Sequence, residues 1–170
     1  MEAKGLMIEA LGRIRSVLHR SLSDLTLDDL HRQPQVGANS IAWLAWHLTR
    51  VQDVAISGLA GREQAWISQG WHARFDLAPD PSNDGYGDTP EQVAALRVPS
   101  AQILLDYHED VQKRSQAYVN GLAPADFDRE LDEPQWQPLP TVGVRLVSVL
   151  SDNLQHAGQA AYLRGLWRIR

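Results

Sequence analysis

The chain has 170 residues, of which 44% are hydrophobic and 22% charged, and its formal net charge is −5. This composition is ordinary for a soluble globular protein, and the length suits one core, so we expect a single domain over residues 1–170. The acidic balance argues against nucleic acid as a partner, because a nucleic-acid-binding face needs clustered basic residues. The absence of cysteine excludes disulfides, thiolate metal ligands and a cysteine nucleophile, and fits a cytoplasmic protein.

The first residues carry mixed charge without a long apolar run, so we expect no signal peptide. No window approaches the roughly 18 to 20 apolar residues of a membrane span, so no membrane association is expected. Six tryptophans are many beside two phenylalanines. Most would lie in a helical core, and Trp66, Trp71 and Trp136 are candidates for lining a pocket or an interface.

The first half of the chain predicts two long helices. The first covers about residues 2–20, and a short helical turn capped by Thr26 follows it. The second begins at Asn39 or Ser40, both good N-caps, and ends near residue 59. Residues 60–88, rich in glycine, proline and aromatic residues, predict a long, ordered and irregular connection, which in a compact domain is usually functional.

The second half predicts two more long helices. A Thr-Pro-Glu-Gln sequence at residues 89–92 opens a short helix, and the third long helix follows Ser100 and ends at Asn120. Four prolines make residues 123–140 irregular, and the fourth long helix covers residues 141–164. The sequence therefore predicts an all-α protein, a four-helix bundle with long connecting loops.

Three side chains on two of these helices form a candidate metal site. Asp152 and His156 are four residues apart, so they share one face of the fourth helix. His47 lies at the edge of the apolar stripe of the second helix. If these helices face each other, the three side chains would form a mononuclear site with coordination positions left for water or substrate.

The spacing alone leaves simpler interpretations open. Asp152 and His156 would also form an ordinary i,i+4 ion pair, and either His47 or His156 would serve as a histidine satisfied within the core. An Asp-x-x-x-His pair is less specific than a two-histidine metal motif. His108 lies in a charged stretch and is expected to be solvated.

Longer segments around these residues resemble the DinB-like superfamily, and specifically its actinobacterial mycothiol transferase-like branch. The resemblance extends over nearly the whole chain. Its most specific parts are His47-Leu48 and the His-Ala-Gly-Gln sequence that begins at His156. The resembling segments are residues 37–53, 85–90, 104–108 and 141–165.

The resemblance implies a four-helix bundle that holds a divalent metal through His47, Asp152 and His156. Many members have histidine where this chain has Asp152, and an Asp/His/His set would favour Zn, Ni, Mn or Fe. Relatives with shown activity join a low-molecular-weight thiol to an electrophile, or isomerise a substrate with the help of a thiol. The expected function is therefore a metal-dependent thiol S-transferase that uses mycothiol or a similar thiol and a small electrophile.

Two further residues are expected to contact the cofactor or substrate. Gln159 lies one turn beyond His156 and would either support a metal ligand or face the substrate, and Arg50, or else Arg145, would hold a substrate anion. One alternative function is metal-assisted hydrolysis, with an acid such as Asp53 as the base. Another is a non-catalytic stress protein that binds a metal or a ligand. A helical domain of this size is also expected to form a homodimer.

Overall fold

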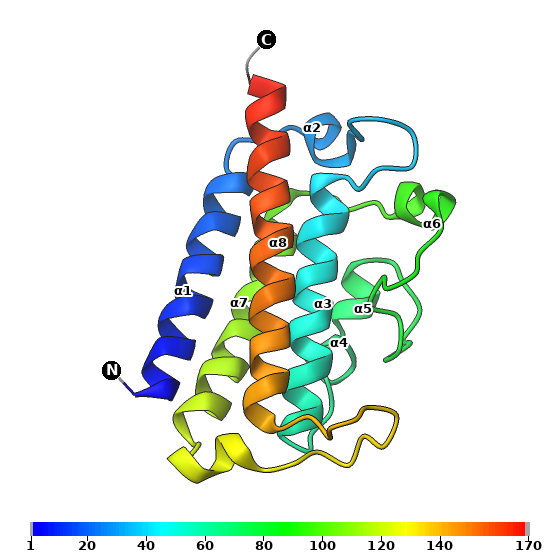
Figure 1. The fold of residues 1–170 in the computed structure, drawn as a ribbon. Coiled ribbons are helices and arrows are strands. Elements are labelled where there is room, and N and C mark those ends of the chain that lie inside the picture. The colour runs from blue at the N-terminus through cyan, green and yellow to red at the C-terminus, as the bar shows by residue number, and fades with distance from the viewer. Residues whose placement is uncertain (1, 169–170) are drawn as a thin grey trace.

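The computed structural model describes residues 2–168, and its four long helices run lengthwise beside one another (Figure 1). Figure 1 shows two of them running in one direction and two in the other, an up-down-down-up order. The first and second long helices each contact both the third and the fourth, so the four enclose a common core. They are α1 (Ala3–Leu22), α3 (Ile41–Leu59), α7 (Ala101–Asn120) and α8 (Val142–Arg168).

The all-α prediction is confirmed for the described residues, whose only ladder contact is one antiparallel bridge between Glu130 and Thr141. None of the helices within residues 2–168 is long and apolar enough to cross a membrane. Helix α1 presents one buried stripe at helical spacing, as its sequence predicts. Helix α3 begins where expected, because the Ser40 side chain accepts a hydrogen bond from the Trp43 N–H.

The short helices follow local capping chemistry. Thr26 and Asp29 form a capping box at α2 (Leu27–His31), and Thr89 and Gln92 form another at α6 (Pro90–Ala95), as predicted. Three further short helices lie in regions expected to be irregular: α4 (Ala65–Ser68), α5 (Trp71–Arg74) and the 3-10 helix η1 (Pro124–Asp128).

Helix α8 continues beyond its predicted end. Gly165 is a stop signal by propensity, yet the helix extends to Arg168. Leu163 is buried, Trp167 packs against the core, and the Arg32 guanidinium lies 4.3 Å from the centre of the Trp167 ring. These contacts stabilise the last turn by more than a single glycine destabilises it.

The connection between α3 and α7 packs against the bundle through aromatic side chains. The rings of Trp66 and Phe75 lie 5.6 and 5.7 Å from that of Tyr107 on α7, and Trp71 lies 5.2 Å from it. Trp66 and Trp71 therefore belong to the core. The sequence had made them candidates for lining a pocket or an interface. Trp136, by contrast, is 58% exposed and lines a pocket.

His108 is fully buried, so the prediction that it is solvated was wrong. Helix α7 turns this side chain toward α3, where its Nδ1 lies 3.3 Å from the Thr49 hydroxyl. Burial lowers the pKa of His108 to about 4, so the ring is neutral at physiological pH. A buried hydrogen-bond network continues along the same interface through Gln52, Gln112, Ser115 and Asn153.

A buried carboxylate on α3 ties the connection to the core. Both oxygens of Asp53 accept hydrogen bonds from the backbone N–H groups of Ala65 and Trp66, and the Tyr107 hydroxyl also donates to Asp53. Burial, followed by the charge of Asp53, raises the pKa of Tyr107, which keeps the hydroxyl protonated and able to donate. Arg50 Nη1 lies 3.6 Å from Asp53 Oδ2 and balances its charge.

We predict that Asp53→Ala lowers the free energy of unfolding by about 3 to 5 kcal/mol, because it leaves the Arg50 guanidinium buried without its counter-ion. Urea unfolding followed by circular dichroism measures the loss. Asp106→Ala is the control, since Asp106 is exposed on α7 and accepts a hydrogen bond from the neighbouring Gln102. Similar losses in the two variants would contradict the role assigned to Asp53.

Candidate metal centre

His47 of α3 and the pair Asp152 and His156 of α8 converge at one point. Each offers one ligand atom, and these atoms all lie within 4.8 Å of one another. His47 Nε2 is 3.7 Å and His156 Nε2 is 3.4 Å from the same oxygen, Asp152 Oδ1. The structure thus brings together three residues that the sequence predicts to be metal ligands.

Two oxygen acceptors orient the imidazoles. His47 Nδ1 lies 2.5 Å from the backbone carbonyl oxygen of Asp84, and His156 Nδ1 lies 2.8 Å from Gln159 Oε1. A carbonyl oxygen only accepts, so each Nδ1 carries a proton and each neutral ring presents its Nε2 lone pair to the shared centre. Gln159 is therefore a partner of a candidate ligand, which is one of the two roles expected for it.

Trp43, one turn before His47, holds the rings from the side. Its indole stacks on the His47 ring at 4.6 Å with an interplanar angle of 11°, and its edge meets the His156 ring at 6.3 Å. The Trp43 Nε1–H donates to Asp88 Oδ2 at 3.0 Å, which fixes the indole. The stacked ring leaves His47 little rotational freedom.

Gly85 allows the loop to approach these rings. Its φ of +89° favours glycine, and a Cβ there would lie 2.8 Å from Trp46, 3.0 Å from Trp43 and 3.1 Å from His47 Nδ1. Only glycine fits this position without displacing the rings. The Asp84 carbonyl reaches His47 because the next residue takes up so little space.

Arg50 does not occupy the position expected of a residue that holds a substrate anion. Its side chain is fully buried and donates to the carbonyl oxygens of Pro81 and Asn83, to Gln64 Oε1 and to the Tyr107 hydroxyl. A buried guanidinium must be satisfied internally, and these partners satisfy it. Arg50 therefore anchors the loop beside Asp84 and has no surface left for a ligand.

The second arginine considered for this role, Arg145, is engaged as well. It forms an ion pair with Glu133 at the edge of a pocket.

The charges of the three candidate ligands are coupled. Burial alone would raise the pKa of Asp152, but the neighbouring rings of His156 and His47 outweigh it and lower that pKa to about 2. The nearby Asp152 carboxylate raises the pKa of His156 against the effect of burial, and Gln159 raises it further. Without a cation, the carboxylate is thus ionised and attracts a proton to His156.

The donor set fits a divalent cation. Asp152 Oδ2 is buried and has no hydrogen-bond partner, so this carboxylate retains an unused ligand atom. Two imidazole nitrogens and one carboxylate suit Zn, Ni, Mn or Fe, as the sequence predicts, and they do not distinguish among them.

The sequence interpretation missed the residues that support the ligands. Trp43 had a signal, since it precedes His47 by one helical turn. The backbone carbonyl of Asp84 had none, because any residue carries that group. The Gly-Tyr-Gly sequence at residues 85–87 indicates a turn but not what the turn packs against.

We predict that Gly85→Ala weakens divalent metal binding at least about tenfold, because the added methyl group displaces the rings of Trp43 and His47. It should also lower the free energy of unfolding by about 1 to 3 kcal/mol more than Gly87→Ala does. Gly87 is the matched control, because its φ is +82° and a Cβ there meets open space. Isothermal titration with zinc and urea unfolding measure the two effects, and equal effects of the two variants would contradict the packing argument.

A pH dependence follows from the coupled charges. The lowered pKa of Asp152 contributes stability that is present above its ordinary value of 3.8 and lost as pH falls toward about 2. The raised pKa of His156 contributes stability that is complete below 6.5 and lost as pH rises through the folded-state value.

In the metal-free protein, Asp152→Asn should therefore cost more stability at about pH 5.5 than at about pH 9. The zinc affinity of the parent protein should rise from about pH 5.5 to about pH 9, because His156 releases its proton as the pH rises. Unfolding titrations with a chelator present measure the first effect, and a stability difference that grows with pH would oppose the assignment.

Comparison with known proteins places this geometry in a family. The crystal structure of a protein described as the conserved protein of a locus from Enterococcus faecalis matches with a TM-score of 0.89 and 32% sequence identity over 96% of each chain. No match is found among curated proteins. Residues 10–160, which include the three candidate ligands, match the DinB superfamily, whose members bind divalent metals. These comparisons do not extend to the actinobacterial mycothiol transferase-like branch, but they establish that the chain belongs to the DinB superfamily.

Proposed function

We propose that the protein is a divalent-metal-dependent thiol S-transferase, which joins a low-molecular-weight thiol of the mycothiol type to a small electrophile. The observation that carries this proposal is the convergence of His47, Asp152 and His156 as three ligands with oriented lone pairs. Three protein ligands leave coordination positions for a substrate. Since the chain has no cysteine, the sulfur must come from a separate thiol.

When bound by these residues, a divalent metal would supply a Lewis acid that lowers a thiol pKa from about 8.5 toward neutrality. The chain itself orients the reaction. The Asp84 carbonyl and Gln159 keep both imidazoles directed at one point, and Trp43 shields His47 from water. In the transfer, the thiol proton passes to solvent, the sulfur forms a bond to the electrophilic carbon, and any leaving group departs with its electron pair.

Hydrolysis is the second candidate, and the structure favours it less. The expected base, Asp53, is 1% exposed and accepts hydrogen bonds from two backbone N–H groups and Tyr107. Asp53 thus serves as a hydrogen-bond acceptor inside the core. Activation of a thiol needs no such base, because the lowered pKa alone yields the nucleophile. A non-catalytic protein that binds a metal or a ligand is the third candidate, and it shares the same site.

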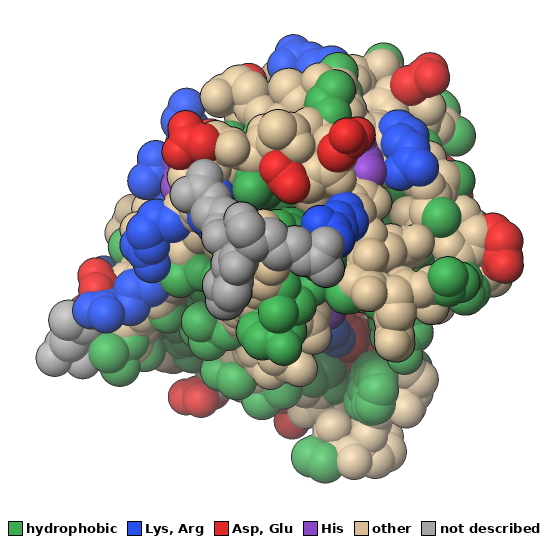
Figure 2. All heavy atoms as spheres, turned by 90° about the horizontal axis from the view of Figure 1, so that it is seen from above, with side chains coloured by type: hydrophobic (Ala, Val, Ile, Leu, Met, Phe, Trp, Pro, Cys, Tyr) green, Lys and Arg blue, Asp and Glu red, His purple; other side chains and the backbone are tan. Residues whose placement is uncertain are grey.

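The packing of the four long helices supports the expected four-helix bundle of DinB-like type. The homodimer and the cytoplasmic location stay predictions. Helix α8 turns Val147, Leu154 and Tyr162 outward, with 63%, 53% and 67% exposure. Figure 2 shows hydrophobic side chains gathered on part of the face that is seen from above, and such surfaces are common where chains associate.

The proposal is tested with the purified protein, His156→Ala and the control His72→Ala, which removes a histidine outside the candidate site. We expect about one divalent metal per chain in the parent and the control, and little in His156→Ala, by elemental analysis. With monochlorobimane as electrophile, conjugate should form only when mycothiol is present, and at least about tenfold more slowly in His156→Ala.

The outcomes separate the three candidates. Equal metal content in His156→Ala and the parent would remove the ligand assignment. Consumption of electrophiles without thiol would favour hydrolysis over transfer. A full metal content with no turnover over a panel of electrophiles would favour the binding protein.

A further inference from the structure

We propose that a pocket of about 640 Å³ beside the candidate metal centre binds an uncharged, largely apolar small molecule. The further assignment of this molecule as the electrophile rests on the proposed function. The volume is in the range of pockets that enclose small organic ligands. No residue of this pocket is among the three candidate metal ligands, so it is a separate binding surface.

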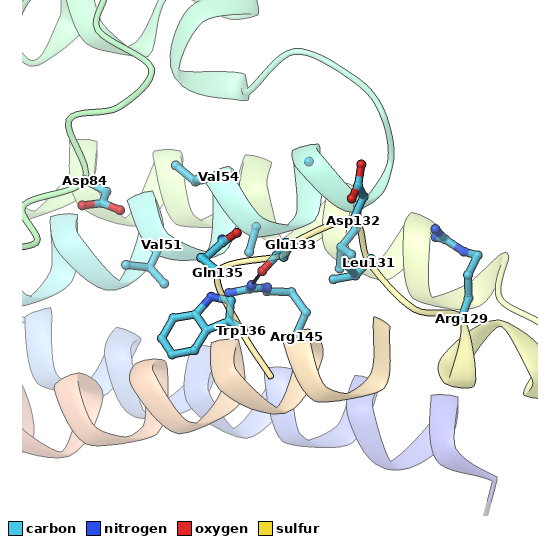
Figure 3. A pocket seen from close by; sticks show the side chains of 13 residues that line it. Val51, Val54, Asp84, Arg129, Leu131, Asp132, Glu133, Gln135, Trp136 and Arg145 are labelled. Carbon is cyan, nitrogen blue, oxygen red and sulfur yellow. Dashed lines mark hydrogen bonds and ion pairs between the residues drawn. The ribbon is translucent and has the colours of Figure 1, made fainter. Parts of the chain in front are cut away.

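Helix α3 forms the floor of the pocket. Residues 41–50 of this helix are all buried, but the second half of the helix has one face that is only half-buried. That face is wholly apolar and carries Val51, Val54, Ala55, Gly58 and Leu59. Figure 3 shows Val51 and Val54 along this helix, with the side chains of the 129–136 segment opposite them. An apolar ligand gains free energy by removing both surfaces from water.

Trp136 provides the other apolar surface. It comes from the irregular segment before α8, lines the pocket and is 58% exposed. In Figure 3 its indole extends toward the end of the pocket where Val51 lies. A large aromatic side chain left exposed opposite an apolar floor is suited to cover a flat ligand.

The pocket adjoins the metal centre through both helices and the loop. Asp84 lines the pocket, and its backbone carbonyl is the acceptor of His47 Nδ1. Val51 lies one helical turn from His47 on the same side of α3. Arg145 of the pocket precedes Asp152 by seven residues on α8, which is two turns, or roughly 10 Å, along the same side. A small ligand here would lie within reach of a second substrate at the metal centre.

The charges of the pocket select against anions. Asp84, Asp132 and Glu133 oppose two guanidinium groups, those of Arg129 and Arg145, so carboxylates are in excess. Arg145 is already paired with Glu133. An anionic ligand would be repelled by this excess of negative charge, which includes Asp84 at the end of the pocket where Val51 lies, whereas an uncharged ligand would not be repelled.

Two fluorescent probes that differ by one sulfonate test the pocket on the metal-loaded protein. N-phenyl-1-naphthylamine is uncharged, and 8-anilinonaphthalene-1-sulfonate has the same ring system with a negative charge. We expect the uncharged probe to bind at least about tenfold more tightly. Equal or tighter binding of the sulfonate would overturn the charge argument.

Gly58→Phe tests the location, since a Cβ at this helical glycine meets nothing within 4 Å and the ring would fill the pocket. Gly12→Phe on α1 is the matched control, because a Cβ there also meets nothing within 4 Å and Gly12 does not line the pocket. We expect Gly58→Phe to weaken binding of the uncharged probe at least about tenfold and Gly12→Phe to leave it unchanged. Binding that is equal in Gly58→Phe and the parent would overturn the proposal.

Metal content and turnover separate this inference from the proposed function. All three proteins should hold the same amount of metal, which shows that Gly58→Phe leaves the centre intact. Loss of probe binding in a protein that shows no thiol-dependent turnover would defeat the proposed function and leave the pocket in place. An unchanged KM for monochlorobimane in Gly58→Phe, with turnover present, would defeat the assignment of the electrophile to this pocket.

Discussion

The arrangement of the candidate centre depends on a buried positive charge. Arg50 is fully enclosed, and a guanidinium in that position must be paired and hydrogen-bonded on all sides. Asp53 supplies the opposite charge, and the carbonyl groups of Pro81 and Asn83 accept hydrogen bonds beside those accepted by Gln64 and Tyr107. The loop is thereby fixed to α3 at the residue before Asp84, whose carbonyl orients His47. A side chain that touches no candidate ligand thus determines where a ligand points.

The centre itself is built to attract a cation whether or not one is present. Asp152 lies between two imidazoles and stays ionised, so it places a negative charge at the point toward which both Nε2 atoms are directed. Protons and metal ions compete for the same nitrogen lone pairs. The outer hydrogen bonds, from His47 to Asp84 and from His156 to Gln159, do not change in this competition. A carboxylate in place of a third imidazole therefore strengthens the attraction for a divalent ion while the ring orientations are kept by the surrounding residues.

The long helices and the placement of Asp152 and His156 on one helix face could be predicted from the sequence because both depend on local spacing, whereas the grouping of His47 with this pair followed from the resemblance to the DinB-like superfamily. Apolar periodicity marks the helices, and a four-residue interval places Asp152 and His156 on one face. The environment of α3 could not be predicted, because the side of the helix that α7 and α8 leave free is partly covered by the loop around residues 81–85, which no local pattern reveals. Nor does the sequence show which distant residues pack over His108 and Arg50. His108 was expected to be solvated and Arg50 to hold a substrate anion, but both side chains are buried. Gly85 has a visible turn signal, but the rings that require a glycine come from another helix.

Helix α3 therefore combines two environments along its length. Its first half is enclosed and carries His47, and its second half leaves an apolar face open as the floor of the pocket. One rigid element thus sets the separation between the metal centre and a neighbouring ligand, which is how binding geometry is kept constant in helical proteins. The opposite wall comes from the irregular segment around Trp136, which contributes no candidate metal ligand. Substitutions in that segment would alter which molecule fits the pocket while the hydrogen bonds that orient the imidazoles stay intact. The fold separates the residues that would select a substrate from those that would activate it.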